Sequence, residues 1–219
     1  MTHSQRAGTL KLVFVRHGDA FDVAGRCIGH TDVALSEEGA LSVHRLMAET
    51  SAEFASDHVS GARSLSIASS DLQRAVQTAE IVANSLALPY TTDVRLREMN
   101  FGEWDGRWWS ELETADGERL RAWMENWTEI ASPGGEAVAE LQVRVNSWLE
   151  DYHVISSGID RTVIVISHAG FIRAALCQLL AIPISQMFDI PVSHARATTV
   201  MLTNDRAPVL VTADAPLIS

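Results

Sequence analysis

The chain has 219 residues, of which 47% are hydrophobic and 21% charged, so it can bury a sizeable core and is not a disordered polymer. Its formal net charge of −11 argues against a nucleic-acid partner, because such proteins normally present a basic face. Two cysteines, Cys27 and Cys177, are too few for a disulfide framework or a metal cluster. No apolar run has the length of a membrane span or a signal-peptide core, which predicts a cytoplasmic protein with no membrane partner.

Strand-like and helix-like segments alternate along the chain. Short runs rich in β-branched residues predict strands, and apolar residues at helical spacing predict helices. In chain order, we expect a strand at 11–15, a helix from Ser36 to about residue 50, a strand at 64–68, a helix at 71–88, a helix at 136–152, a strand at 162–166, a helix at 170–180, and strands at 198–203 and 209–212. This order predicts an α/β fold with a largely parallel sheet.

Two regions depart from this alternation. The last two predicted strands flank the turn-like sequence NDRAP, so we expect an antiparallel pair at one edge of the sheet. Residues 104–127 include five tryptophans and are expected to form helical pieces, which either line a pocket for an aromatic or nucleoside-like substrate or only pack together. No repeat or linker divides the chain, so we expect one domain, 1–219, with residues 99–135 as an irregular helical cap.

Three of the predicted strands are followed directly by polar residues. The sequences after residues 15, 68 and 166 are RHG, SSDLQR and SHAG. Ligands of open parallel sheets bind beyond the carboxyl ends of the strands, so these residues are expected at one edge. They bring together Arg16, His17, Arg74 and His168. This cationic cluster favours a phosphoryl group, because arginine binds phosphate through bidentate hydrogen bonds.

The strand sequence LKLVFVRHGDA predicts where the phosphoryl group binds. Burying the Arg16 guanidinium is costly without an anion, so we expect the substrate to supply the compensating charge. Arg74 is expected in the first turn of its helix, where backbone N–H groups also favour an anion. Adjacent strand residues point in opposite directions. For Arg16 and His17 to face one phosphate, the strand must break at His17, and Gly18 is expected to ease that turn.

The same cluster suggests a reaction. A neutral imidazole is a competent nucleophile toward phosphorus, and neighbouring guanidiniums disfavour its protonated form, which makes His17 a candidate nucleophile. The leaving oxygen then needs a proton donor. Glu98, in LREMNFGEWDG, is the leading candidate, because a carboxyl group in a partly apolar pocket can act as a general acid. The alternatives are Glu103 or Asp105 as the acid, and a simple ion pair of Glu98 with Arg95 or Arg97.

Four stretches in this order, LVFVRHGDA, SSDLQRAVQTAE, LREMNFGEWDG and ISHAGFIR, resemble the signatures of the histidine phosphatase superfamily, also called phosphoglycerate-mutase-like. They span residues 12–173. The resemblance implies a three-layer α/β/α sandwich and a phosphohistidine intermediate on His17. It implies that Arg16, Arg74 and His168 hold the phosphoryl group, and that Glu98 protonates the leaving group and then activates water. It implies no metal and no other cofactor, because the cationic cluster replaces Mg²⁺.

Other segments point to a branch of the family. GRCIGHTDVALSEEG, FGEWDGRWWSEL and SPGGEAVAELQVRV resemble the alpha-ribazole phosphatase and broad-specificity phosphatase branches. Mutases of the family typically carry an Asn shortly after the first motif, where this chain has FDVAG, and a longer insertion before the second histidine. We therefore expect a monomeric or homodimeric phosphatase of a small phosphorylated metabolite, with alpha-ribazole 5′-phosphate as the best single candidate. The alternatives are a phosphoglycerate mutase-type enzyme and a non-catalytic phospholigand-binding module.

Several residues near the motifs have less certain roles. Arg26 and His30 lie in a loop expected near the pocket, as substrate contacts or as solvated charges. Ala169, next to His168, is grouped with the substrate-binding residues. SHAG at 167–170 follows a strand and starts a helix, and its glycine allows close backbone approach, which places His168 in the site. SHAR at 193–196 lacks that context, so His194 is expected to be structural or on the rim.

Overall fold

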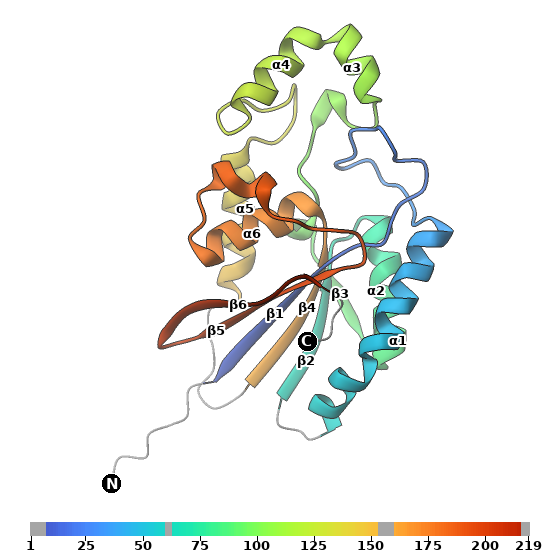
Figure 1. The fold of residues 1–219 in the computed structure, drawn as a ribbon, viewed down its shortest axis with the longest axis vertical. Coiled ribbons are helices and arrows are strands. Elements are labelled where there is room, and N and C mark those ends of the chain that lie inside the picture. Colours follow the sequence, from blue (N-terminus) through green and yellow to red (C-terminus); the bar gives the residue numbers. More distant parts are fainter. Residues whose placement is uncertain (1–7, 60–62, 153–159, 216–219) are drawn as a thin grey trace.

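A computed structural model describes residues 8–59, 63–152 and 160–215, so residues 1–7, the first part of the N-terminal stretch considered for a signal peptide, lie outside it. Six strands form one sheet in the order β3-β2-β4-β1-β5-β6 (Figure 1). They are β1 Thr9–Arg16, β2 Arg63–Ser69, β3 Tyr90–Thr92, β4 Asp160–Ser167, β5 Ala197–Thr203 and β6 Arg206–Ala215. The first four run parallel, β5 runs antiparallel to β1, and β6 pairs antiparallel with β5. The predicted antiparallel edge is confirmed.

Helices cover both faces of the sheet, as the three-layer expectation requires (Figure 1). The helices are α1 Glu37–Val59, α2 Gln73–Leu86, α3 Trp109–Ala115, α4 Gly117–Asn126, α5 Val138–Glu150 and α6 Ala169–Leu180. Alternate residues of β1 divide between two cores: Leu12 and Phe14 pack in the cluster with α5 and α6, and Val13 and Val15 pack in the cluster with α1 and α2. Both faces of β1 are therefore buried, which explains its continuous apolar run.

The predicted elements correspond to observed ones, with two local differences. The strand β3 was not predicted, because its three residues are too short to show a periodic pattern. Helix α1 was expected to end near residue 50 but continues to Val59. Its predicted start is confirmed, because the Ser36 hydroxyl accepts a hydrogen bond of 2.9 Å from the Gly39 backbone N–H. Among the described helices, none combines the length and apolar character that a bilayer span needs.

The predicted cap, residues 99–135, contains the short helix η2 Gly102–Trp104 together with α3 and α4. It lies beyond the carboxyl ends of the strands, at the top of Figure 1. The Trp104 side chain is fully buried and packs edge-on against Trp123, with ring centroids 5.8 Å apart. Its indole N–H donates a hydrogen bond to Asp116. Trp104 therefore serves packing, one of the two roles considered for these tryptophans.

Candidate active site

The carboxyl ends of β1, β2 and β4 meet at one edge of the sheet. Arg16 pairs in register with Ser167, and Ser69 pairs with Ile166. His17 and His168 are the residues that follow β1 and β4, and Arg74 lies in the first turn of α2 after β2. The predicted convergence of these side chains is present in the structure.

The strand β1 ends at Arg16, so the regular strand is interrupted at His17, where the break was predicted. The His17 backbone N–H still donates to Ser167, while the N–H of Ala195 donates to the Arg16 carbonyl. The φ of Gly18 is not among the positive values of the described glycines, so the predicted easing of the turn by Gly18 stays a prediction. A Cβ at Gly18 would lie 2.6 Å from the carbonyl oxygen of Gly39, so close approach of α1 requires the glycine.

Hydrogen bonds fix the tautomer of His17. Its Nδ1 lies 2.6 Å from the Gly18 carbonyl oxygen, which can only accept, so Nδ1 carries the proton. Its Nε2 is then a lone pair, and it accepts a hydrogen bond of 3.2 Å from Arg74 Nε. Burial, reinforced by the Arg74 guanidinium, holds the pKa of His17 well below its ordinary value. The imidazole is therefore neutral at pH 7, with Nε2 available as a nucleophile.

Arg74 is the scaffold of the site and is almost completely buried. Its Nε–H is shared between His17 Nε2 and His168 Nδ1, each at 3.2 Å. Its two terminal nitrogens donate to the carbonyl oxygens of Thr31, at 2.9 Å, and Gly29, at 2.7 Å. These bonds use three of its five N–H groups, so two remain for a phosphoryl oxygen. Of the backbone N–H groups in the first turn of α2, which were expected to favour an anion, that of Gln73 donates to Asp32.

His168 lies behind this scaffold and is fully buried. Because Nδ1 accepts from Arg74, Nε2 carries the proton and donates to the Ser70 hydroxyl at 2.9 Å. Burial, with smaller contributions from His17 and Arg74, holds the pKa of His168 well below its ordinary value. Neither His168 nor Ala169 belongs to the wall of the cavity described below. In this arrangement, His168 holds the Arg74 guanidinium in place. The ring centroids of His168 and His17 lie 4.9 Å apart.

Arg16 is held by one terminal nitrogen, which donates to the Val192 carbonyl at 2.8 Å. Its buried Nε has no hydrogen-bond partner among the described residues. Arg173 on α6 is a second cation near Arg16. It is the last residue of the motif ISHAGFIR, no role was predicted for it, and it lines the same cavity as Arg16. Burial lowers the pKa of Arg16, Arg74 and Arg173 from the ordinary value. Uncompensated positive charge of this kind is stabilised when an anion enters.

Glu98 is one of the carboxylates that line the same cavity, and its charge acts on Arg16, Arg74 and Arg173. Its Oε1 accepts from the Gly170 N–H at the start of α6 and from the Met99 N–H, both at 2.9 Å. Arg144 donates to the Glu98 carbonyl and pairs with Glu136, which holds the backbone at this position. A Cβ at Gly170 would overlap Oε1, so the glycine predicted to allow close approach makes room for the Glu98 carboxylate.

The alternatives to Glu98 have other partners. Asp105 accepts hydrogen bonds from the N–H groups of Gly29, His30 and Thr31 and from the Thr31 hydroxyl. Burial acts to raise the pKa of Asp105, but these hydrogen bonds outweigh it and lower the pKa, so Asp105 is an ionised support for the loop. Glu103 is exposed and faces Arg119. The two arginines considered as ion-pair partners of Glu98 pair with other residues. Arg95 pairs with Asp93 and Asp151, and Arg97 pairs with Asp71.

A cavity of about 780 Å³ opens over these groups. Its wall includes Arg16, His17, Arg26, Arg74, Glu98, Phe101, Trp109, Arg173 and His194. Arg26 pairs with Asp22 and stacks 4.5 Å from the Trp108 ring. His30 is not on the wall. Its Nε2 lies 2.9 Å from the Glu98 carbonyl oxygen, so we assign it to holding Glu98 rather than to contacting substrate.

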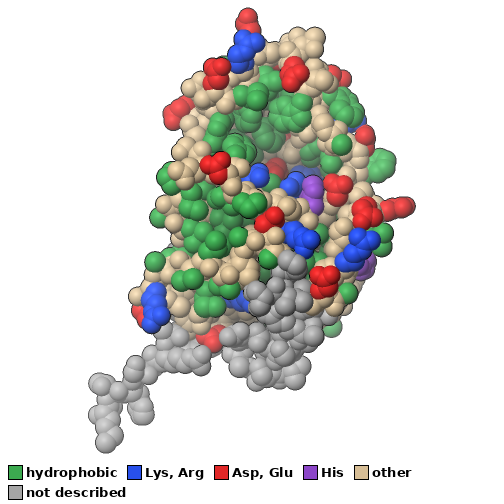
Figure 2. Space-filling view, viewed as in Figure 1, with side chains coloured by type: hydrophobic (Ala, Val, Ile, Leu, Met, Phe, Trp, Pro, Cys, Tyr) green, Lys and Arg blue, Asp and Glu red, His purple; other side chains and the backbone are tan. Residues whose placement is uncertain are grey.

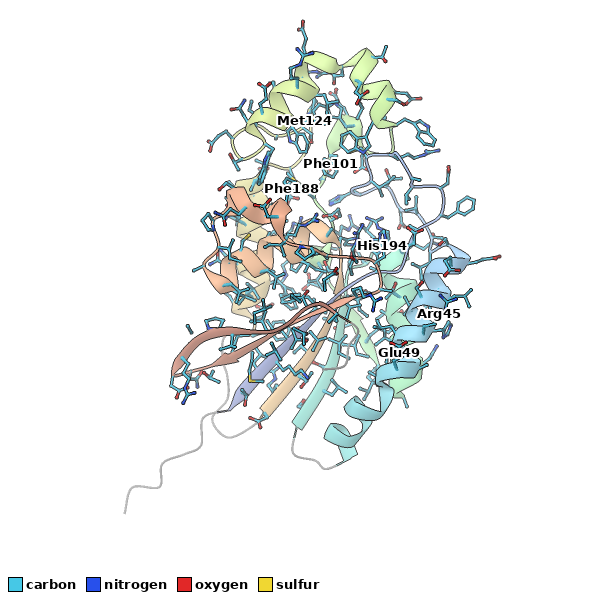
Figure 3. All side chains as sticks on the ribbon, in the orientation of Figure 1. Arg45, Glu49, Phe101, Met124, Phe188 and His194 are labelled. Carbon is cyan, nitrogen blue, oxygen red and sulfur yellow. The ribbon has the colours of Figure 1, made fainter. Side chains whose placement is uncertain are left out.

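His194 has a more central position than the sequence indicated. Its ring lies on the cavity wall, with its centroid 5.3 Å from that of His17, and Nδ1 lies 3.6 Å from Asp19 (Figure 3). Burial, with the Arg16 charge, lowers the pKa of His194 to about 4. Residues 193–196 have no strand–helix context that would indicate this position. Its place is set by Ala195, whose N–H donates to the Arg16 and His17 carbonyls across the sheet.

Comparison with known proteins agrees with this geometry. The model of the histidine phosphatase superfamily, branch 1, matches residues 12–215. The chain belongs to this superfamily. The match covers every side chain of the histidine phosphatase site described above, from Arg16 to His194.

Relatives within the superfamily carry different names. Phosphoserine phosphatase 1 of Hydrogenobacter thermophilus (strain DSM 6534 / IAM 12695 / TK-6) is 30% identical over 92% of this chain and 90% of its own length. A probable phosphoglycerate mutase of Yersinia pestis (strain Pestoides F) is 34% identical over 80% and 76%. The crystal structure of a putative alpha-ribazole-5′-P phosphatase from Escherichia coli str. K-12 substr. MG1655 has the same fold, with a TM-score of 0.82 at 23% identity over 96% and 98% of the two chains.

Proposed function

We propose that the protein is a phosphoric monoester hydrolase that works through a phosphohistidine on His17. The observation that carries this proposal is the tautomer of His17: a neutral ring with its Nε2 lone pair aimed at a buried cluster of guanidiniums. Such a ring is a nucleophile already placed beside the charges that a phosphoryl group needs.

In the first step, His17 Nε2 attacks phosphorus while the bond from phosphorus to the ester oxygen breaks. Arg16 and Arg74 hold the equatorial oxygens and offset the charge that develops on them. Glu98 donates a proton to the departing oxygen, which leaves as an alcohol. His168 acts through Arg74, because its Nδ1 and the guanidinium share a hydrogen bond.

In the second step, water attacks phosphorus, and the bond between phosphorus and Nε2 breaks. Glu98, which lost its proton in the first step, takes a proton from this water and so returns to its protonated form. Inorganic phosphate leaves and His17 is again neutral. Every charge in this cycle is handled by side chains of the chain itself, and the proposal includes no metal or other cofactor.

The substrate is proposed to be a small phosphorylated metabolite in the cytoplasm, with alpha-ribazole 5′-phosphate as the best single candidate. Support comes from the sequence segments shared with that branch and from the similar fold of a protein with that name. The working form is proposed to be a monomer or a homodimer.

The test uses a phosphomonoester labelled with ³²P and an alkaline quench, which preserves phosphohistidine. Wild type should retain acid-labile label on the protein, and His17→Ala should retain none. Label on the His17→Ala protein would overturn the nucleophile. A phosphate-release screen with alpha-ribazole 5′-phosphate, phosphoserine and 3-phosphoglycerate, with and without EDTA, then ranks the substrates. Transfer of label to a second phosphoglycerate without phosphate release would instead assign a mutase, the activity named for one of the relatives.

A further inference from the structure

We call the cavity of about 780 Å³ over Arg16, His17 and Arg74 the phosphoryl cavity. An apolar groove lies next to it and has no part in the chemistry above. Its volume is about 470 Å³. Eight side chains line it: Phe101, Trp109, Glu113, Leu120, Trp123, Met124, Trp127 and Phe188. They come from α3, α4 and the residue directly after it, the loop before η2, and the short helix η3 Ile184–Asp189. We call this feature the aromatic groove.

The aromatic groove and the phosphoryl cavity share one wall. Phe101 and Trp109 line both. Arg173 lines the cavity and lies 5.7 Å over the ring of Phe188, which lines the groove. Figure 2 shows the same arrangement: hydrophobic side chains surround a hollow in the upper part of the molecule, and cationic side chains lie at its lower edge. A molecule bound by its phosphoryl group can therefore extend past Phe101 and Trp109 into the aromatic groove, in addition to the apolar residues on the cavity wall itself.

The groove is built from rings and offers little to a polar ligand. Phe101 meets Trp109 and Trp123 edge-on, with ring centroids 6.5 and 6.0 Å apart. Trp127 and Phe188 also meet edge-on, with ring centroids 4.7 Å apart. Among its described wall residues, Glu113 is the one charged side chain, and it excludes a second anionic group. Such walls fit a flat apolar or aromatic group.

Two of the wall residues expose much of their surface. Met124 is 64% exposed and Phe188 is 49% exposed, and in Figure 3 Met124 lies above Phe101 and Phe188 lies below it. Exposed apolar side chains gathered at a hollow are typical of binding surfaces rather than of ordinary protein surface. The volume of the groove is within the range of small-molecule pockets, and its continuity with the reacting site favours part of the substrate over a separate partner.

We propose that the aromatic groove binds the leaving group of the substrate, and that the preferred substrates are phosphomonoesters of alcohols with an aromatic or large apolar group. This inference rests on the proposed phosphatase activity. Small polar esters leave the groove empty and gain nothing from it. Burying a two-ring group there raises kcat/KM by roughly 10²-fold over an ester that ends in a methyl group.

The test compares two esters whose leaving groups are both primary alcohols, ethyl phosphate and 2-(1-naphthyl)ethyl phosphate. The chemical step is then the same, so the ratio of their kcat/KM values reports binding of the leaving group, and the groove variants assign that binding to the aromatic groove. We expect a ratio of roughly 10² for wild type. The ratio should fall by about 5- to 10-fold in Phe188→Ala, and further in Met124→Glu, which places a charge at the opening.

Matched variants control for changes of an exposed apolar side chain elsewhere. Leu41→Ala on α1 matches Phe188→Ala, because Leu41 is also 49% exposed, and Val94→Glu matches Met124→Glu, because Val94 is 61% exposed. Both controls should keep the wild-type ratio. A wild-type ratio near one, with phosphohistidine formed from both esters, would overturn the groove as a subsite.

Binding of the product alcohol separates this inference from the proposed function. In His17→Ala, 2-(1-naphthyl)ethanol should quench the fluorescence of the groove tryptophans, and Met124→Glu should weaken that binding. Fluorescence quenching by the alcohol, without hydrolysis of any ester by wild type, would overturn the proposed phosphatase function but would support an apolar binding site in the groove. A dimer in sedimentation velocity that Met124→Glu dissociates, together with a ratio near one, would assign the groove to a second copy of the chain and overturn the proposal.

Discussion

The phosphoryl cavity and the aromatic groove share Phe101 and Trp109 but are held in opposite ways. In the cavity, His17, Arg74 and Glu98 each have hydrogen-bond partners that fix their orientation. In the groove, rings pack against rings, and Met124 and Phe188 remain 64% and 49% exposed. The cavity is built where strands end, and the groove is built by a segment outside the strand–helix alternation. Our proposals therefore place the reaction at the carboxyl ends of the strands and the selectivity for the leaving group in the groove beside them.

The two regions also differ in charge. The cavity gathers Arg16, Arg74 and Arg173 in a chain whose net charge is −11, and burial lowers the pKa of all three. The groove has a single carboxylate among its described wall residues. Substitutions in the cavity should therefore lower turnover of the ethyl and naphthylethyl esters by the same factor, whereas substitutions in the groove change their ratio.

The largest of these effects is expected for Glu98→Gln. Without an acid and base, kcat for both esters should fall by about 10³-fold, with their ratio kept. A good leaving group needs no protonation, so 4-nitrophenyl phosphate should still give a burst of one equivalent of nitrophenol and accumulate phosphohistidine. Rapid-quench measurements report both. Loss of the burst would show that Glu98 is needed for attack by His17 itself.

A smaller loss is expected for Arg74→Lys. An ammonium group cannot bond both imidazoles and the carbonyls of Gly29 and Thr31, so kcat/KM for both esters should fall by about 10²-fold. The unpaired carbonyls should also lower the free energy of unfolding by about 1–3 kcal/mol, measured by urea titration. A change in the ratio of the esters, at unchanged kcat, would place Arg74 in leaving-group recognition instead.

A still smaller effect is expected for Gly170→Ala, which tests whether Glu98 must sit at the start of α6. The added Cβ takes the place of Oε1 and displaces a flexible side chain, so kcat should fall about 10-fold while the melting temperature changes little. Gly117→Ala in α4 is the matched control, because its Cβ would meet no atom within 4 Å. Equal kcat in wild type and Gly170→Ala would contradict the assigned position of Glu98.

The smallest effect concerns acid stability. His17, His168 and His194 have pKa values below the ordinary 6.5, so below that pH the unfolded chain binds more protons than the folded chain. The stability that they contribute is therefore fully present above about pH 6.5 and is lost as the pH falls, by up to about 1.4 kcal/mol per pH unit for each histidine. Urea unfolding between pH 7.5 and 4.5 measures this slope.

Removing one of the three histidines sharpens that measurement. In His194→Asn, the slope of the unfolding free energy against pH, between pH 6.5 and about 4, should decrease by up to about 1.4 kcal/mol per pH unit, the contribution of one proton. His44→Asn, at an exposed position on α1, controls for the loss of a histidine. An undiminished slope in His194→Asn would show that its burial beside Arg16 has no consequence for stability.

Most of the fold was predictable because the pattern is local. Strands β1, β2 and β4 carry apolar runs that end in polar residues, and the helices between them show helical spacing and a clear N-cap at Ser36. The short strand β3 and the extension of α1 past residue 50 carry no such pattern. The sequence also indicated which side chains meet at the sheet edge, because parallel strands bring their carboxyl ends together.

The supports of the site were not predictable, since they join distant parts of the chain. Asp105 holds the loop at Gly29 from 76 positions away, and Arg144 holds the Glu98 carbonyl from 46 positions away. His194 illustrates the same limit: its local sequence indicated a rim or structural residue, but strand pairing puts its ring beside His17.

The sequence by itself determined the α/β alternation, the break of β1 at His17 and the types of side chain that meet at the sheet edge, because periodicity and strand direction are written in neighbouring residues. The tertiary structure decided which carboxylate faces the cluster, why Gly18 must lack a side chain, and that the tryptophans divide between core packing and the groove wall. Those outcomes depend on contacts between residues far apart in the chain, and only the folded molecule brings them together.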